Sequence, residues 1–284
     1  MEENEKQKDP SRLKVLKKIE ELETAGIFDV DVEDDPPTKM LMPNKVDYLN
    51  KKLSSKIATK IANAMGRKFI KKITKDGVLR IKEIKGIENF QNLKTGAIIT
   101  CNHFNPMDSF AMQVCFDASK QKKKRMYKVI REGNYTNFPG IFGFFMRHCS
   151  TLPLSSNRDT MKKFLHAVNT ILQRGDFILV YPEQSMWWNY RKPKPLKKSA
   201  FKFAASNNVP VLPIFITMED SADLGPDGFP IQVYTINVGE PIMPDNNLSV
   251  LENTNNMKDK NYQVWKNIYE DTYKTKLTYL CDEK

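Results

Sequence analysis

The chain has 284 residues, of which 40% are hydrophobic and 28% are charged. This composition excludes wholesale disorder, a collagen-like repeat and a small disulfide-stapled fold, while the length allows one large domain or two small ones. Lys and Arg outnumber Asp and Glu by 45 to 34, a net charge of +11 that favours an anionic partner such as a phospholipid surface, a phosphate-bearing substrate or a nucleic acid.

The first segment, residues 1–40, combines a short helix with an acidic linker. Apolar residues at three-residue steps predict a helix over 11–23 that ends near Gly26. The acidic run Asp29–Asp35 and the pair Pro36-Pro37 predict a linker after it. No apolar stretch near the start resembles a secretion signal, and the four cysteines have no zinc-site spacing, so we expect a reduced, cytoplasmic protein.

The second segment, residues 41–76, has the pattern of basic amphipathic helices. Apolar residues recur every three or four positions from Val46 to Ile73 and predict one continuous helical face, with Gly66 as the candidate break. The other face of 45–75 carries ten Lys or Arg against the single acid Asp47. A cationic face over an aliphatic one is typical of helices that lie in a membrane interface. A helix pair docked on its own domain is the alternative.

The third segment, residues 77–284, alternates short apolar runs with helical patterns. The runs lie at 96–100, 125–130, 151–154, 177–181, 209–217 and 231–238. Helical patterns lie at 108–119, 138–147, 159–174 and 197–206, and a closing helix is expected over 257–280. We therefore predict an α/β domain with a mostly parallel sheet flanked by helices, whose chemistry gathers at the carboxyl ends of the strands. No run approaches the roughly 18 to 20 apolar residues of a spanning helix.

One histidine stands where such chemistry is expected. His103 directly follows the run 96–100, and Asp108 comes five residues later, after Pro106, which suits the start of a helix. A carboxylate that holds one imidazole nitrogen leaves the other nitrogen free to act as a general base for a hydroxyl. A loop histidine satisfied by local hydrogen bonds is the structural alternative. His148 and His166 have no comparable partner, and Cys101 near His103 forms no oriented nucleophile pair.

Four ordered blocks resemble a known family. They are Asn-His-x-x-x-x-Asp at 102–108, Lys-Val-Ile-Arg-Glu at 128–132 with Pro-Gly-Ile-Phe-Gly at 139–143, Tyr-Pro-Glu-Gln-Ser at 181–185, and Val-Pro-Val-Leu-Pro-Ile at 209–214. In order and spacing they resemble the glycerolipid acyltransferases, in particular the bacterial 1-acylglycerol-3-phosphate acyltransferases, over about residues 90–240.

The resemblance implies an acyltransferase domain in 77–284 and roles for particular residues. His103 would be the base that deprotonates the acceptor hydroxyl, Asp108 its orienting partner, and Glu183 the acid of the third block, placed in the substrate site. Pro213 matches the proline of the fourth block. No metal, cofactor or acyl-enzyme is implied, because the acceptor oxygen attacks the thioester of acyl-CoA or acyl carrier protein directly.

The chain departs from the family where an acceptor phosphate is expected to bind. The third block usually reads Glu-Gly-Thr-Arg, but here Met186 stands where the arginine is expected. The second block lacks its arginine until Arg158. We expect replacement cations to hold the phosphate, since guanidinium and ammonium groups both satisfy phosphate oxygens. The candidate clamp residues are Lys128, Arg158, Arg191 and Lys192.

The expected function is therefore acyl transfer to a lysophospholipid, giving phosphatidate in phospholipid biosynthesis. The basic helices resemble the family's membrane-docking helices, so we expect an anionic membrane surface as partner and a peripheral location on the inner face of the cell membrane. The aromatic cluster Trp187, Trp188 and Tyr190 either rests on lipid headgroups or packs inside the protein. A non-catalytic lipid-binding relative and a different acceptor remain alternatives; nucleic-acid binding is supported by charge alone, and we expect none.

Overall fold

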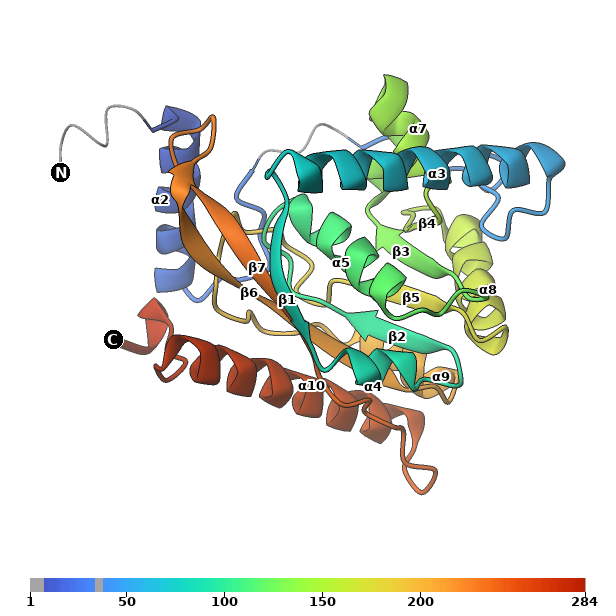
Figure 1. The fold of residues 1–284 in the computed structure, drawn as a ribbon. Coiled ribbons are helices and arrows are strands. Elements are labelled where there is room, and N and C mark those ends of the chain that lie inside the picture. Colours follow the sequence, from blue (N-terminus) through green and yellow to red (C-terminus); the bar gives the residue numbers. More distant parts are fainter. Residues whose placement is uncertain (1–7, 34–37, 284) are drawn as a thin grey trace.

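Seven strands form one sheet in the computed structural model, which describes residues 8–33 and 38–283. The strands are β1 (Arg80–Lys85), β2 (Ala97–Thr100), β3 (Met126–Ile130), β4 (Thr151–Pro153), β5 (Phe177–Val180), β6 (Val211–Leu224) and β7 (Pro230–Val238). Their order across the sheet is β1-β7-β6-β2-β5-β3-β4 (Figure 1). The pair β6 and β7 is antiparallel and every other neighbouring pair is parallel, which confirms the predicted fold class.

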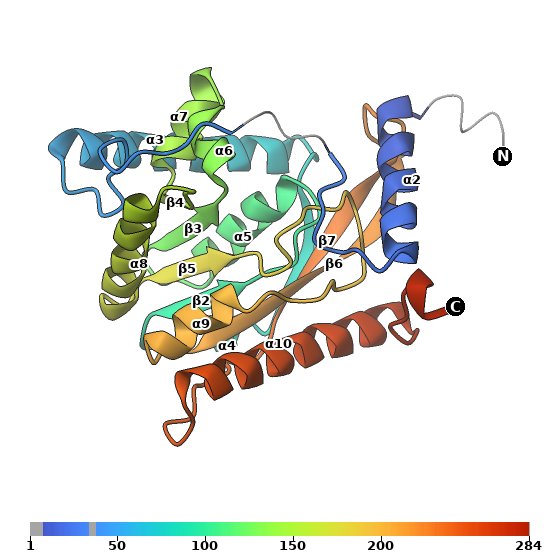
Figure 2. The same ribbon diagram turned by 180° about the vertical axis from the view of Figure 1, so that it is seen from behind.

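Helices cover both faces of this sheet. They are α2 (Pro10–Thr24), α3 (Leu53–Lys75), α4 (Ile87–Gln91), α5 (Met107–Ala118), α6 (Glu132–Thr136), α7 (Gly140–His148), α8 (Arg158–Gln173), α9 (Ser199–Ser206) and α10 (Val250–Tyr273), with a 3-10 turn η1 (Leu280–Glu283). Helices α3, α4 and α5 lie on the face shown in Figure 1, and α8, α9 and α10 lie on the opposite face shown in Figure 2. None of the helices in the described ranges has the length and apolar character needed to cross a bilayer.

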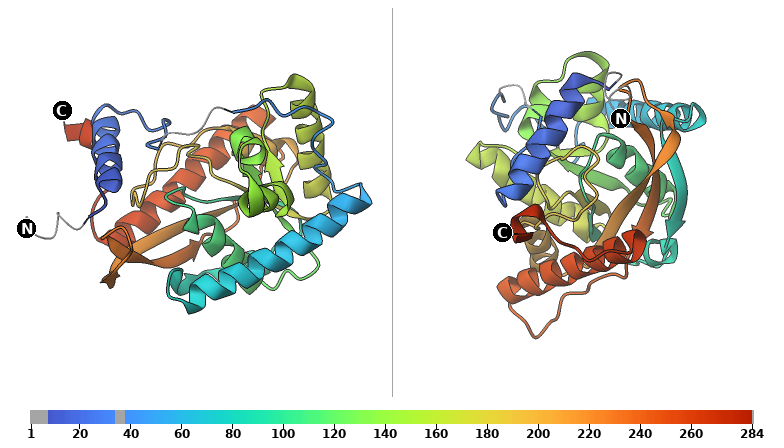
Figure 3. Two further views of the ribbon diagram at one scale, coloured as in Figure 1. Left: turned by 90° about the horizontal axis from the view of Figure 1, so that it is seen from above. Right: turned by 90° about the vertical axis from the view of Figure 1, so that its left-hand side faces the viewer.

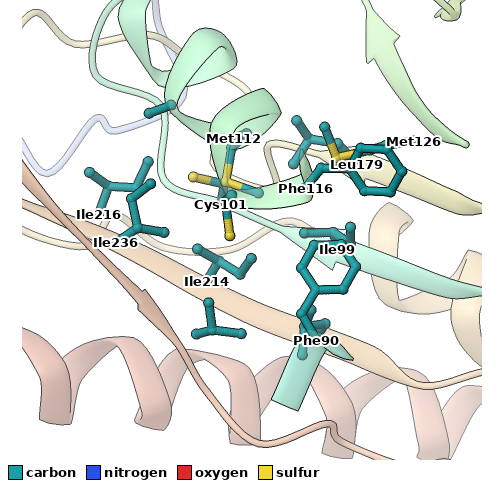
Figure 4. Packing of buried hydrophobic residues seen from close by; sticks show 14 of the residues in the cluster. Phe90, Ile99, Cys101, Met112, Phe116, Met126, Leu179, Ile214, Ile216 and Ile236 are labelled. Carbon is teal, nitrogen blue, oxygen red and sulfur yellow. The ribbon is translucent and has the colours of Figure 1, made fainter. Parts of the chain in front are cut away.

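The two faces of the sheet have separate hydrophobic cores. Ile99, Cys101 and Leu179 point to the face covered by α5, where they meet Met112 and Phe116 (Figure 4). The next residues along the same strands face the other way, toward α8 and α9, because side chains alternate along a strand. Strand β2 is therefore buried on both sides, as a central parallel strand requires.

The basic segment is a single helix rather than a pair. Helix α3 runs without a break through Gly66 and begins only at Leu53, so the predicted start near residue 45 is wrong. The carboxylate of Asp47 accepts hydrogen bonds from the main-chain N–H groups of Lys51 and Lys52, each at 2.9 Å, and holds the preceding residues in turns. Val46, Tyr48 and Leu49 pack instead against the core on the α8 side of the sheet.

The predicted ends of the sheet and of the closing helix also differ from the structure. Strand β1 was missed because its sequence, Arg-Ile-Lys-Glu-Ile-Lys, contains no apolar run. It lies at the edge of the sheet, where charged side chains protect against pairing with other chains. Strand β6 extends seven residues beyond its predicted end at 217, and with β7 it forms a hairpin beside α2 (Figure 1). The closing helix begins at Val250 rather than at 257, because a capping box formed by Ser249 and Glu252 fixes its start. The helix ends at Tyr273 rather than at 280.

The predicted helix over 11–23 is confirmed as α2, which begins after its N-cap Asp9. Ile19 of α2 and Val32 of the following segment pack against Trp187, so the start of the described chain contacts the loop after β5. The predicted linker residues 34–37, including Pro36 and Pro37, lie outside the described residues.

Candidate active site

The strand register brings two of the sequence blocks together. Thr100, the last residue of β2, is paired with Val180, the last residue of the parallel strand β5. His103 and Glu183 each follow three residues later, so both lie at the same edge of the sheet. The two sequence blocks are 80 residues apart in the chain. They are neighbours in space because the carboxyl ends of parallel strands lie at the same edge of a sheet.

His103 and Asp108 form the predicted pair. His103 Nδ1 lies 2.7 Å from Asp108 Oδ2, and because a carboxylate only accepts, Nδ1 carries the proton of this hydrogen bond. Asp108 is 1% exposed in the first turn of α5, and the same Oδ2 also accepts from the main-chain N–H of Phe104 at 3.2 Å. The imidazole keeps 26% of its surface exposed. This arrangement leaves Nε2 as the nitrogen that can accept a proton.

An aromatic ring fixes the imidazole from one side. The ring of Tyr181 stacks on His103 with centroids 4.3 Å apart and an angle of 24° between the planes. Its buried hydroxyl lies beside the side chains of Asp108 and Ser109, and burial, followed by the charge of Asp108, raises the pKa of Tyr181 well above its ordinary value. Tyr181 therefore remains neutral and restricts the tilt of the imidazole.

Glu183 supports the main chain at the site. Its Oε2 accepts from the main-chain N–H of His103 at 3.0 Å, and its Oε1 accepts from the main-chain N–H of Lys194 at 2.9 Å. The carboxylate is buried, and burial raises its pKa although the Lys194 ammonium, 3.7 Å away, acts in the opposite direction. Glu183 thus holds together the two chain segments that contain His103 and Lys194.

Lys194 was not singled out from the sequence, yet it is fully buried beside Glu183. Its ammonium donates to the main-chain oxygen of Ser185 at 2.7 Å and to the hydroxyl of the same residue at 2.9 Å. Burial lowers the pKa of Lys194 to about 8, against the opposing effect of Glu183. No local pattern marks this lysine, because its partner lies eleven residues back across a loop.

The aromatic cluster in the loop 184–192 packs inside the protein. Trp187 is fully buried and stacks with Phe28 of the N-terminal segment, and Trp188 packs edge-on against Phe229 of the β6–β7 hairpin. The main-chain N–H of Trp187 also donates to the carbonyl of His103 at 3.3 Å. Of the two alternatives for this cluster, internal packing is the one observed, and it anchors the loop beside His103.

The four predicted clamp residues lie in different surroundings. Lys128 is half-buried, donates to Gln113 at 3.2 Å, and has its pKa lowered by burial. Arg158 is exposed at the start of α8. Arg191 is paired with Asp220 at 2.7 Å and Lys192 with Glu23 at 2.6 Å. Two of the four cations thus already have a carboxylate partner within the chain.

Arg131 is a further cation at the site that sequence reasoning missed. It directly follows β3, the neighbour of β5, and its Nη2 donates to the main-chain oxygen of Gln184 at 2.9 Å. Arg131 also forms an ion pair with Asp31 of the N-terminal segment. Its place at the carboxyl end of a parallel strand was the signal available, since this is the edge where His103 lies.

The remaining reactive residues do not join the pair. Cys101 is buried in the core, and burial raises the pKa of its thiol well above the ordinary value, which disfavours a thiolate nucleophile (Figure 4). His148 lies in α7 against Phe144, and His166 is exposed on α8. Within residues 8–33 and 38–283, no group of three or more His, Cys, Asp or Glu side chains is arranged to hold a metal ion.

Comparisons with known proteins agree with this arrangement. The model of the Acyltransferase family matches residues 82–217, a range that contains His103, Asp108 and Glu183. No curated protein sequence was found to match the chain. The fold is similar to the crystal structure of PlsC, the 1-acyl-sn-glycerophosphate (LPA) acyltransferase from Thermotoga maritima, with a TM-score of 0.52 and 19% identity. The similarity covers 81% of this chain and 87% of that chain.

Proposed function

Because this protein is an acyltransferase, with residues 82–217 forming the domain of that family, we propose that it acylates the free hydroxyl of a lysophospholipid. The acceptor is 1-acylglycerol-3-phosphate, the product is phosphatidate, and the donor is a thioester of coenzyme A or acyl carrier protein. The observation that carries this proposal is the 2.7 Å contact between His103 Nδ1 and the buried carboxylate of Asp108 at the end of β2. The name of the PlsC relative supports the choice of acceptor.

The residues of this pair account for the proton transfers of the reaction. His103 Nε2 takes the proton of the acceptor hydroxyl while the oxygen attacks the thioester carbonyl, and Asp108 stabilises the imidazolium that forms. The tetrahedral intermediate then collapses and the carbon–sulfur bond breaks. The departing sulfur takes the proton back from His103 and leaves as a thiol. The ester oxygen of the product comes from the acceptor, and no acyl group is attached to the enzyme.

A direct test is lipid mass spectrometry after mixing the purified protein with lysophosphatidate and an acyl donor. Phosphatidate carrying the donor's acyl chain is the expected product, with acyl-CoA and acyl carrier protein thioesters tried in parallel. Transfer only to acceptors that lack a phosphate would contradict the acceptor assignment, and no transfer to any lysolipid would contradict the proposal as a whole.

We further propose that α3 and α7 hold the protein on an anionic membrane, its peripheral location being the inner face of the cell membrane. Five apolar residues of α3 are 39–72% exposed, namely Leu53, Ile57, Ile61, Met65 and Phe69. They lie four residues apart along one stripe, beside the basic residues of the same helix. Helix α7 contacts α3 and adds exposed Ile141 and Phe142, and Phe138 in the loop just before α7 is exposed as well (Figure 3). An apolar stripe beside cations suits the boundary between acyl chains and anionic headgroups.

Replacing Ile57, Ile61 and Met65 together by Ser is expected to weaken binding to phosphatidylglycerol vesicles by about a hundredfold, because burying each side chain contributes about 1 kcal/mol or more. Vesicle sedimentation measures the bound fraction. The matched control is Leu251→Ser on α10, an exposed leucine on the other side of the sheet, which should leave binding unchanged.

The cations of the same surface should make this binding depend on salt. Each Lys near an anionic bilayer contributes on the order of 1 kcal/mol at low salt. Exchanging Lys51, Lys52, Lys56 and Lys60 for Gln should therefore reduce vesicle binding and flatten its salt dependence. Binding that ignores both salt and these substitutions would speak against the membrane proposal, and tight RNA binding in the same buffer would favour a nucleic acid as partner.

Arg131 is the cation that we expect to hold the acceptor phosphate, since it lies at the same sheet edge as His103 and contacts the loop after Glu183. Charge-assisted hydrogen bonds contribute about 1.5–3 kcal/mol, so Arg131→Ala should raise the KM for lysophosphatidate about ten- to a hundredfold. The KM for 1-acylglycerol, which lacks the phosphate, should change far less.

The control is Arg125→Ala, at the opposite end of β3, which should not distinguish the two acceptors. Alanine variants of Lys128, Arg158, Arg191 and Lys192, assayed in the same way, test the clamp predicted from the sequence. If all five site variants treat the two acceptors as the native enzyme does, phosphate recognition by these cations is refuted.

A further inference from the structure

The segment that follows α2 lies across the loop after β5. Three consecutive loop residues donate hydrogen bonds to it: the hydroxyl of Ser185 to the carbonyl of Phe28 at 2.6 Å, the main-chain N–H of Met186 to Asp31 Oδ1 at 3.1 Å, and the indole N–H of Trp187 to the carbonyl of Val30 at 2.8 Å. Figure 2 shows the blue segment running beside the gold loop that follows β5. The two stretches are therefore fastened residue by residue.

Two donors hold the side chain of Asp31. One of its oxygens accepts from the main-chain N–H of Met186, and the other pairs with the guanidinium of Arg131. A guanidinium and a main-chain N–H are the donors that commonly hold phosphate oxygens. The loop that carries the N–H of Met186 also contacts His103, because Trp187 donates to the carbonyl of His103 and Glu183 accepts from its N–H.

Other acids at this end of the chain are arranged differently. Asp29 pairs with the partly buried Lys197 at 2.7 Å, and Glu23 pairs with Lys192 at 2.6 Å. Among these three acids, only Asp31 combines a cation with a main-chain N–H of the loop 184–192. Its side chain is 27% exposed and that of Arg131 is 42% exposed, so a ligand from solvent can reach the pair.

We propose that Asp31 is an internal ligand of an anion site formed by Arg131 and the main-chain N–H of Met186, and that it sets acceptor preference. A phosphate-bearing acceptor binds there only by displacing this carboxylate. The inference rests on the proposed function, because it assigns the displaced position to the phosphate of the lysolipid. Asp31 consequently weakens the affinity for phosphate relative to acceptors without one.

Asp31→Asn tests the proposal with little change of shape, since the amide oxygen still accepts from Met186 while the negative charge facing Arg131 is lost. Titration calorimetry of the full chain with inorganic phosphate should give a Kd about two- to fivefold lower in the variant, the range expected for a partly exposed ion pair. Adding Arg131→Ala should remove this gain. Asp29→Asn is the matched control and should bind phosphate as the native protein does.

The second readout is the choice of acceptor. Asp31→Asn should lower the KM for lysophosphatidate about two- to fivefold and leave the KM for 1-acylglycerol unchanged. Equal changes for both acceptors, or phosphate binding no tighter than in the native protein, would overturn the proposal. If thermal unfolding shows that Asp31→Asn is poorly folded, Asp31→Ser serves in its place under the same criteria.

The two arms separate this inference from the proposed function. Phosphate titration requires no turnover, so tighter binding by the variant together with no acyl transfer to lysophosphatidate would refute the function and keep the anion site. Acyl transfer to lysophosphatidate by the native enzyme, together with no effect of Asp31→Asn on phosphate binding or on KM, would keep the proposed function and refute the anion site.

Discussion

His103→Ala should reduce acyl transfer by about two to four orders of magnitude, the usual contribution of a positioned general base. The reason is that the acceptor hydroxyl loses the imidazole that a buried carboxylate, Asp108, holds at this sheet edge. Initial rates with lysophosphatidate and a saturating acyl donor measure the effect, and donor affinity should change little.

Two variants make the result specific. Asp108→Asn keeps the shape of the pair but removes the charge that orients the imidazole, so the rate should fall although His103 is present. His166→Ala removes an exposed histidine of α8 and should leave the rate unchanged. Native turnover in His103→Ala, or a covalent acyl-enzyme detected by mass spectrometry, would contradict direct attack by the acceptor.

The second large effect concerns stability. Glu183→Ala should lower the free energy of unfolding by about 3–5 kcal/mol, because it leaves the buried ammonium of Lys194 without its carboxylate and the N–H of His103 without its acceptor. Urea denaturation measures this difference. The comparison variant is Glu219→Ala. Glu219 also pairs with a lysine, Lys82, but at the surface, so its loss should lower the free energy of unfolding by no more than about 1 kcal/mol.

A third variant separates the charge from the packing. If the cost arises from an unpaired buried ammonium, Glu183→Ala combined with Lys194→Met should be less destabilised than Glu183→Ala alone, since the apolar side chain needs no partner. A double variant as unstable as the sum of the two single variants would show that the pair is not energetically coupled.

The sequence predicted the features that depend on short spacing. The alternation of apolar runs and helical patterns was sufficient for the α/β class and for most strands, and the five-residue step from His103 to Asp108 across a strand-to-helix turn was sufficient for the pair. The start of α3 was missed because a single side chain, Asp47, stabilises a turn where the apolar period continues.

Features that depend on the path of the chain were not predictable. Arg131, Asp31 and Lys194 are unremarkable charges in the sequence, and each obtains its place from a contact with the loop after β5. That loop turns at Gln184 and Asn189, which both have positive φ. Neither residue is a glycine, so the sequence gives no sign of these turns. The path of this loop determines which of the many surface cations lie near His103. The amino-acid composition carries no information about that path.

The bonds between the N-terminal segment and this loop have a consequence for the order of assembly during synthesis. Asp31 and its partner Met186 are 155 residues apart, and Glu23 accepts from the N–H of Leu280, 257 residues away. At about 5–20 residues per second, the ribosome delivers the loop roughly 10–30 s after the segment. Helix α2 and its acids therefore remain exposed to solvent until the loop 184–192 has been synthesised, and the surroundings of His103 are completed only after that.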